Sequence, residues 1–206
     1  MSRRASSHRW YRTQSTDPFV KRREQAGLRS RAAFKLEELL TRERLCRPGQ
    51  VVLDFGSAPG GWSQVVAPRV GAEGLVVAVD ILPMDPLPGV TFVQGDATDD
   101  AVLDEIRIAL GGRAVDLVLS DMSPNLTGIR SVDEARSVGL AEQVLEFAQN
   151  FLTTGGTMLM KLFQHNDTEA LIRRIRTEFR QVNRRKPAAS RSQSREFYLV
   201  AGGFQL

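Results

Sequence analysis

Polar side chains stand at or near the carboxyl ends of five apolar segments that are typical of buried β-strands. The segments are 51–55, 75–80, 90–96, 115–121 and 156–163, and the polar positions within them are Asp54, Asp80, Asp96, Asp121 and Lys161. In an open α/β sheet, ligands bind outside the carboxyl ends of parallel strands. A single Asp at a strand end is commonly a helix N-cap. Five such positions together instead favour a ligand site at one edge of a sheet.

The first of these strands runs into a glycine-rich turn, GSAPGGW, over residues 56–62. This turn is neither a dinucleotide fingerprint, because Ala58 and Pro59 interrupt the pattern, nor a P-loop, because no Lys-Ser/Thr follows. Asp80 lies about twenty residues further on, where an acid accepts hydrogen bonds from ribose hydroxyls. Asp96 can accept a hydrogen bond from the exocyclic amino group of adenine. The pattern favours an adenosine ligand without a bound phosphate, and S-adenosylmethionine (SAM), with its cationic sulfonium, fits it.

The elements that must position these residues alternate along most of the chain. Apolar residues at helical spacing predict helices over 18–26, 30–43, 60–70, 99–110, 132–151 and 168–179, and a last strand is expected over 195–202. This alternation predicts an α/β fold, with a doubly wound, mostly parallel sheet and helices on both faces. We expect one domain over residues 17–206, preceded by a flexible basic arm over 1–16 that lacks apolar periodicity.

The composition excludes several classes of protein. The chain has 206 residues, 42% of them hydrophobic, which suits one domain with its own core. No apolar run reaches the ~18 residues of a membrane-spanning helix, and the basic N-terminus lacks the apolar stretch of a secretory signal. One cysteine and two histidines argue against disulfides and against a metal site. These features favour a cytoplasmic protein.

Charge is distributed unevenly along the chain. The formal net charge is +4, with +8 over residues 1–48, −9 over 49–179 and +5 over 180–206. If both basic ends fold onto one face, they form a cationic surface that suits a polyanion such as RNA. Basic residues near a chain end can equally be a solvated tail.

The sequence resembles the FtsJ/RlmE family of SAM-dependent ribosomal RNA ribose 2′-O-methyltransferases. The matching stretches are GLRSRAAFKLEEL (27–39), LDFGSAPGGWSQ (53–64), GDATD (95–99), DLVLSDMSPNLTG (116–128), MKLFQ (160–164) and SREFYLVA (194–201). The resemblance implies a seven-stranded Rossmann-like sheet whose last strand is antiparallel. It also implies SAM contacts at Gly60, Trp62, Asp80, Asp96 and Asp121, although Trp62 can equally be a helix-packing residue.

By the same resemblance, the catalytic Lys-Asp-Lys-Glu tetrad of the family falls on Lys35, Asp121, Lys161 and Glu196. Lys161 is the residue expected to act on the acceptor hydroxyl. Like-charge repulsion from Lys35 would favour its neutral form, whereas Asp121 and Glu196 would favour its cation. Two roles therefore stay open for Lys161: a neutral general base, or a cation that orients the hydroxyl and stabilises the emerging alkoxide.

The bacterial members of the family methylate a uridine ribose in 23S ribosomal RNA. We therefore expect this protein to act as a monomer on the large subunit, without a further protein partner. RNA is expected to contact a basic surface made by Arg22, Arg23, Arg29, Arg31, Arg184, Arg185, Lys186, Arg191 and Arg195, with Trp10 and Tyr11 stacking on bases. Transfer RNA or another RNA is an alternative substrate. A small-molecule methyltransferase fits the basic ends less well, and a non-catalytic RNA-binding module fits the tetrad less well.

Overall fold

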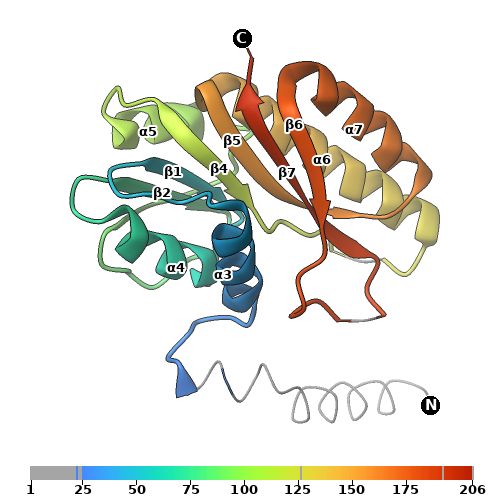
Figure 1. Cartoon of the computed structure of the whole chain (residues 1–206), viewed down its shortest axis with the longest axis horizontal. Coiled ribbons are helices and arrows are strands. Elements are labelled where there is room, and N and C mark those ends of the chain that lie inside the picture. Colours follow the sequence, from blue (N-terminus) through green and yellow to red (C-terminus); the bar gives the residue numbers. More distant parts are fainter. Residues whose placement is uncertain (1–21, 23–24, 126, 192, 206) are drawn as a thin grey trace.

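A seven-stranded sheet with helices on both sides forms the described part of the chain (Figure 1). The computed structural model describes residues 22, 25–125, 127–191 and 193–205. The strands are β1 (Val51–Phe55), β2 (Leu75–Asp80), β3 (Val90–Gln94), β4 (Val115–Ser120), β5 (Leu152–Phe163), β6 (Phe179–Arg185) and β7 (Glu196–Phe204). The helices are α3 (Ala32–Glu43), α4 (Gly61–Val70), α5 (Asp100–Leu110), α6 (Arg130–Phe151) and α7 (Asn166–Glu178).

The strand order is β3-β2-β1-β4-β5-β7-β6. The first five strands in this order run parallel, and β7 runs antiparallel to both β5 and β6. All five residues of β1 are buried, as expected for a central strand covered on both faces. The order reverses between β1 and β4, and such a reversal is where open α/β sheets bind ligands. The predicted doubly wound, mostly parallel sheet with an antiparallel last strand is confirmed.

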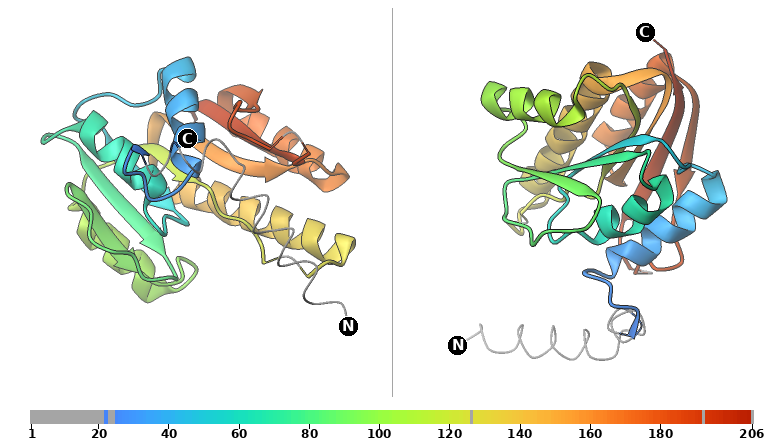
Figure 2. Two further views of the ribbon diagram at one scale, coloured as in Figure 1. Left: turned by 90° about the horizontal axis from the view of Figure 1, so that it is seen from below. Right: turned by 90° about the vertical axis from the view of Figure 1, so that its left-hand side faces the viewer.

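Two separate cores lie on the two faces of the sheet, and Figure 2 shows the helices on both sides. Helices α3 and α4 cover one face, where Leu36, Val52 and Val65 belong to the same core. Helices α5, α6 and α7 cover the other face, where Ile106 and Leu145 belong to the core. Because alternate residues of a strand point to opposite faces, every strand except β6 contributes to both cores.

Strand β6 has no counterpart among the expected elements. Its sequence, FRQVNRR, is basic and has no apolar run. It forms because β7 offers a free edge, with which residues 179–185 pair antiparallel. Only Phe179 and Val182 reach the core, and charged residues are common on edge strands because they oppose pairing with other chains.

Strand β5 begins at Leu152, four residues before the expected start at Gly156. The register with β4 shifts between Val115 and Leu117, and Gly155 has a positive φ of 86°. The Thr-Thr-Gly-Gly stretch therefore forms an irregularity within the strand rather than a turn before it.

Some expectations lie outside the described residues. The basic arm over 1–16 falls there entirely, as do Trp10, Tyr11 and Arg23. The helix expected over 18–26 is described only at residues 22, 25 and 26, of which 22 and 25 are helical. Within the described part of the chain, no helix is long and apolar enough to cross a membrane.

Candidate active site

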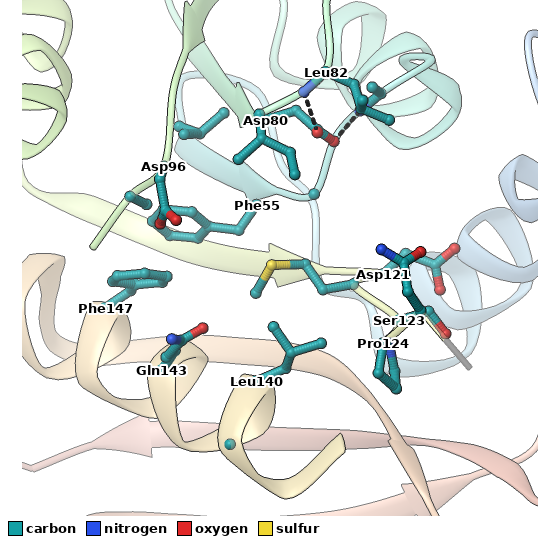
Figure 3. A pocket seen from close by; sticks show the side chains of 18 of the residues that line it. Phe55, Asp80, Leu82, Asp96, Asp121, Ser123, Pro124, Leu140, Gln143 and Phe147 are labelled. Carbon is teal, nitrogen blue, oxygen red and sulfur yellow. Dashed lines mark hydrogen bonds between the residues drawn. The ribbon is translucent and has the colours of Figure 1, made fainter. Parts of the chain in front are cut away.

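A cavity of about 760 Å³ opens at the carboxyl ends of β1, β2, β3 and β4. Figure 3 shows Asp80 and Asp96 on one side of it, and Leu140, Gln143 and Phe147 of α6 on the other. The rings of Phe55 and Phe147 stack with their centroids 4.3 Å apart. The cavity thus has apolar walls and carboxylates from three strand ends, Asp80, Asp96 and Asp121, as the spacing of these residues predicts.

Asp80 connects two of the loops that line the cavity, the one after β1 and the one after β2. Its Oδ2 accepts a hydrogen bond from the backbone N–H of Ala58 at 2.8 Å, and its Oδ1 accepts one from Leu82 N–H at 2.9 Å. Each carboxylate oxygen has two lone pairs, so both oxygens retain acceptor capacity toward the cavity. The carboxylate can therefore accept hydrogen bonds from ribose hydroxyls while it holds the glycine-rich turn in place.

Asp96 has one oxygen engaged and one available. Its Oδ1 accepts the backbone N–H of Thr98 at 2.9 Å and the Thr98 hydroxyl at 2.7 Å. These two hydrogen bonds, the backbone one first, lower the pKa of Asp96 below its ordinary value. The residue is therefore an anion at neutral pH, and its Oδ2 is an acceptor suited to an amino group.

The glycine-rich turn needs a glycine at position 56 because its backbone lies close to the side chain of Met122. Gly56 has φ +70°, and a Cβ placed there would lie 2.3 Å from Cγ of Met122, which also lines the cavity. Gly60 has φ +100°, and a Cβ there would lie within 3.0 Å of Leu87, Met84 and Arg29. Neither Gly60 nor Trp62 is among the cavity-lining residues.

Trp62 is buried between α3 and the sheet. Its indole N–H donates to the carbonyl of Ala32 at 3.0 Å, and its ring lies 5.8 Å from that of Tyr198. The packing interpretation of Trp62 has direct contacts in the structure, whereas its contact with a cofactor, like that of Gly60, stays a prediction.

Lys161 and Asp121 are neighbours because of the register between β4 and β5. Ser120 pairs with Met160, so the next residue on each strand stands at the same edge. Lys161 Nζ donates to the backbone carbonyl of Asp121 at 2.5 Å and lies 3.1 Å from its Oδ1. The Lys161 side chain is only 8% exposed, so this pairing offsets the cost of burying its charge.

The other half of the tetrad comes from α3 and β7. Lys35 Nζ lies 2.5 Å from Glu196 Oε1, and their side chains are 7% and 13% exposed. Burial raises the pKa of Glu196, but the hydrogen bond and charge of Lys35 outweigh burial, so the pKa lies below its ordinary value. Glu196 is therefore an anion at neutral pH.

Tyr198 joins the two halves of the tetrad. Its hydroxyl donates to Asp121 Oδ1 at 2.9 Å and accepts a hydrogen bond from Lys35 Nζ at 3.3 Å. Tyr198 is the direct antiparallel partner of Lys161, so both side chains leave the sheet on the same face. The structure thus brings Lys35, Asp121, Lys161 and Glu196 into one network that runs through a fully buried phenol.

Sequence reasoning did not single out Tyr198. A signal was present, because Glu196 and Tyr198 are two residues apart on a strand and side chains at that spacing share a face. Burial raises the pKa of Tyr198 well above its ordinary value, and the charges of Asp121 and Glu196 raise it further. The phenol therefore stays protonated, and its hydroxyl donates to Asp121 while it accepts from Lys35.

We expect Tyr198→Phe to lower turnover by about tenfold, because the loss of one hydrogen bond to a partly buried carboxylate costs roughly 1–3 kcal/mol. The ring and its packing on Trp62 remain, so the melting temperature should fall by only a few degrees. Methyl transfer and thermal unfolding, measured side by side, test this. A large loss of stability with turnover unchanged would show that the hydroxyl serves only the fold.

Asp54 is a buried carboxyl below the glycine-rich turn. It is 1% exposed; Ser63 Oγ donates to its Oδ2 at 2.6 Å, and its Oδ1 has no hydrogen-bond partner among the described residues. Burial raises the pKa of Asp54 to about 7, against the opposing hydrogen bond from Ser63, and the charges of Asp121 and Asp80 raise it further.

This shift predicts a pH-dependent stability. Between the ordinary value of 3.8 and about 7, the folded protein holds a proton that the unfolded chain has released. The contribution is therefore fully present below pH 3.8 and is lost as the pH rises to about 7, a change of at most about 4 kcal/mol. Asp54→Asn, which does not titrate, should remove this slope, whereas Asp116→Asn should keep it. Urea unfolding from pH 4 to pH 8 measures both, and identical slopes in wild type and Asp54→Asn would contradict the assignment.

Several residues of the expected RNA surface have intramolecular partners. Arg184 pairs with Glu169 and Arg185 with Glu43, and Lys186 donates to the carbonyl of Ser194. Arg195 lies 4.0 Å from Glu134 with its side chain 62% exposed. Arg29 is held by backbone carbonyls, so its guanidinium serves the fold of the site. RNA binding by the basic surface stays a prediction.

Comparisons with known proteins find similar sequences along nearly the whole chain. A family model described as FtsJ-like methyltransferase matches residues 28–204. A curated protein of Xanthomonas campestris named Ribosomal RNA large subunit methyltransferase E is 52% identical over 202 residues, which cover 98% of this chain and 96% of that protein. A protein of the same name from an Azoarcus species is 50% identical, over 97% of this chain and 98% of its own length.

Solved structures give the same result. A crystal structure described as a ribosomal RNA methyltransferase from Plasmodium falciparum superposes with a TM-score of 0.78 at 31% identity, covering 85% of this chain and 98% of that one. A structure from Clostridium thermocellum, at 17% identity and a TM-score of 0.55, shares the fold.

Proposed function

Because this chain belongs to the FtsJ-like methyltransferase family, we propose that it transfers the methyl group of SAM to a uridine ribose 2′-hydroxyl in 23S ribosomal RNA, within assembled or assembling large subunits. The observation that carries this proposal is the position of Asp121. Asp121 lines the cavity, and its carboxylate also accepts a hydrogen bond from the Tyr198 hydroxyl and forms an ion pair with Lys161. A methyl donor in the cavity and an acceptor hydroxyl beside Lys161 would therefore both lie next to the carboxylate of Asp121.

The cavity fits SAM in size and in chemistry. Drug-sized ligands occupy pockets of ~300–1,000 Å³, and the volume of about 760 Å³ lies within that range. Asp80 is suited to the ribose hydroxyls, Asp96 to the adenine amino group and Phe55 with Phe147 to an apolar contact. The three carboxylates around the cavity also suit a ligand with a positive charge. When bound, SAM supplies a methyl carbon activated by its sulfonium.

Lys161 would orient the acceptor hydroxyl. An ammonium has three N–H donors. One donates to the backbone carbonyl of Asp121, and the ammonium lies 3.1 Å from the carboxylate of Asp121 as its ion-pair partner. Another N–H would donate to the ribose oxygen, which fixes the direction of its lone pair and stabilises the charge that develops as its proton leaves. Of the two roles open for Lys161, this contact pattern favours the cation that orients the hydroxyl.

Lys35 and Glu196 would hold the ribose from the opposite side. Their ion pair reaches the same Tyr198 hydroxyl that contacts Asp121, so the two lysines flank one acceptor position. The 2′-hydroxyl is also the group that distinguishes RNA from DNA, which suits a site in which donors and acceptors surround a hydroxyl.

The ribosomal substrate is supported by the names of relatives at 50% and 52% identity. Such a substrate would place the protein in the cytoplasm, and the site requires no second chain, which suits a monomer. Transfer RNA is the second candidate, because the ribose chemistry would be the same.

The test is to incubate the protein with methyl-labelled SAM and, separately, free 23S ribosomal RNA, assembled large subunits and transfer RNA. The methylated nucleotide is then mapped by mass spectrometry. Label in a uridine ribose of the large-subunit samples alone supports the proposal. Label only in transfer RNA, or label on a base, would overturn it.

A further inference from the structure

Arg29 is a predicted RNA contact whose guanidinium instead faces the protein. Its Nη1 donates to the carbonyls of Pro59 at 3.2 Å and Asp85 at 2.6 Å, and its Nη2 donates to the carbonyl of Pro86 at 2.8 Å. These carbonyls belong to two different loops, one after β1 and the other after β2. Arginine suits this position because its planar fork of N–H donors can serve several oxygens at once.

The two loops that Arg29 joins are among the loops that line the cavity. The first contributes Gly56 and Ala58, and the second contributes Ile81 and Leu82. Asp80 links the same loops through the N–H groups of Ala58 and Leu82. Asp80 itself lines the cavity, whereas Arg29 is not among the lining residues. The loops are therefore connected twice, once from within the cavity and once from outside it.

The backbone around Arg29 extends this connection to the helix that carries Lys35. Arg29 N–H donates to Gln64 Oε1 at 2.9 Å, and Gln64 Nε2 donates to the carbonyl of Gly27 at 2.9 Å. Gln64 lies on α4, directly after the glycine-rich turn, and Arg29 lies three residues before α3. One short segment thus contacts both cavity loops and leads into the helix that positions Lys35 beside Glu196.

Gly60 fits the same arrangement. A Cβ at this position would lie 3.0 Å from Arg29 Nη1 and 2.9 Å from Met84 Sδ. The absence of a side chain at Gly60 therefore leaves room for the guanidinium to reach the carbonyl of Pro59. This gives the predicted site glycine a structural function through Arg29, beside its predicted contact with the cofactor.

We propose that Arg29 is a positioning residue that fixes the SAM-binding loops against the segment leading to Lys35. The inference rests on the proposed use of SAM. It predicts that the loss of Arg29 weakens SAM binding, although Arg29 does not line the cavity, and that the loss leaves RNA affinity nearly unchanged.

The experiment measures SAM affinity by calorimetry and 23S ribosomal RNA affinity by filter binding at two salt concentrations. The proteins are wild type, Arg29→Met, Arg29→Lys and Gln64→Leu. Arg107→Met, which removes an exposed arginine away from the cavity, is the matched control. Arg107 lies on α5, pairs with Asp104 on the surface, lies over the ring of Phe151 and does not line the cavity. We expect SAM affinity to fall by about tenfold or more in Arg29→Met, by less in Arg29→Lys and Gln64→Leu, and not at all in Arg107→Met. RNA affinity should stay within about twofold.

The opposite pattern would overturn the proposal. If Arg29→Met binds SAM as tightly as wild type while RNA affinity and its salt dependence fall, Arg29 is a phosphate contact. If Arg29→Met does not fold, Arg29→Lys decides by the same criterion. If the wild-type protein binds no SAM, the proposed function itself is refuted. If the wild type binds SAM and the Arg29 variants bind it equally well, only the role of Arg29 is refuted.

Discussion

Replacing Lys161 with methionine is expected to lower methyl transfer by about a thousandfold or more, because the acceptor hydroxyl loses the N–H donor that Lys161 supplies from β5. Methionine matches the length and apolar stem of lysine, so the neighbouring Met160 and Leu162 keep their packing in the core. Lys161 does not line the cavity, so we expect SAM affinity to remain within a few-fold of wild type.

Single-turnover methyl transfer and calorimetry of SAM binding measure the two quantities separately. Arg174→Met is the matched control, since Arg174 is an exposed cation on α7 whose ion pair with Glu178 lies on the surface. A pH–rate profile separates the two roles of Lys161. A rate that rises with pH as a lysine deprotonates indicates a general base, whereas a cation that orients the hydroxyl gives no such rise. Undiminished turnover in Lys161→Met would remove Lys161 from the chemistry altogether.

Asp121→Asn is expected to lower turnover by at least about a hundredfold and also to weaken SAM binding. The carboxylate pairs with the nearly buried Lys161, and the removal of one partner of such a pair leaves an uncompensated charge at a cost of roughly 3–5 kcal/mol. Asparagine keeps the size of the side chain but directs either an N–H group or a weaker acceptor at Lys161 and Tyr198. Since residue 121 also lines the cavity, we expect the substitution to affect both the binding of SAM and the position of the acceptor hydroxyl.

The same substitution at the opposite end of β4 is the control. Asp116 accepts a hydrogen bond from Val51 N–H at 2.8 Å, far from the cavity-lining residues in the strand. Asp116→Asn should cost some stability and leave the kinetic constants of the folded enzyme unchanged. Equal losses of turnover in both variants would mean that Asp121 acts through stability alone.

The sheet was largely predictable because its central strands are short, apolar and rich in β-branched residues. The first strand and its turn illustrate this, since VVLDF is fully buried and ends where the glycines begin. Strand β6 was not predicted, because a strand at the edge of a sheet is stabilised by hydrogen bonds to its neighbour and does not require an apolar sequence. Its FRQVNRR sequence pairs with β7, and no local pattern encodes that pairing.

The candidate site was predictable where a single strand end defines a residue, as for Asp80 and Asp96. The contacts of Tyr198 and Arg29 depend on distant parts of the chain. Tyr198 meets Asp121 across 77 positions, and Arg29 meets Pro86 across 57. In the sequence, Tyr198 reads as one more core aromatic and Arg29 as one more surface cation. Only the three-dimensional arrangement shows which acceptor each of them faces.

The reversed direction of β7 has a consequence for how this enzyme can change its target. The parallel strands deliver their last residues to the catalytic edge, whereas β7 delivers its first, Glu196 and Tyr198. The connection from β6, residues 186–195, therefore reaches the same edge immediately before the tetrad glutamate. Insertions or substitutions in this connection would reshape the rim of the catalytic centre while the seven paired strands keep their register. Under the proposed function, the architecture would keep a change of RNA target in this connection apart from the residues proposed to perform the reaction.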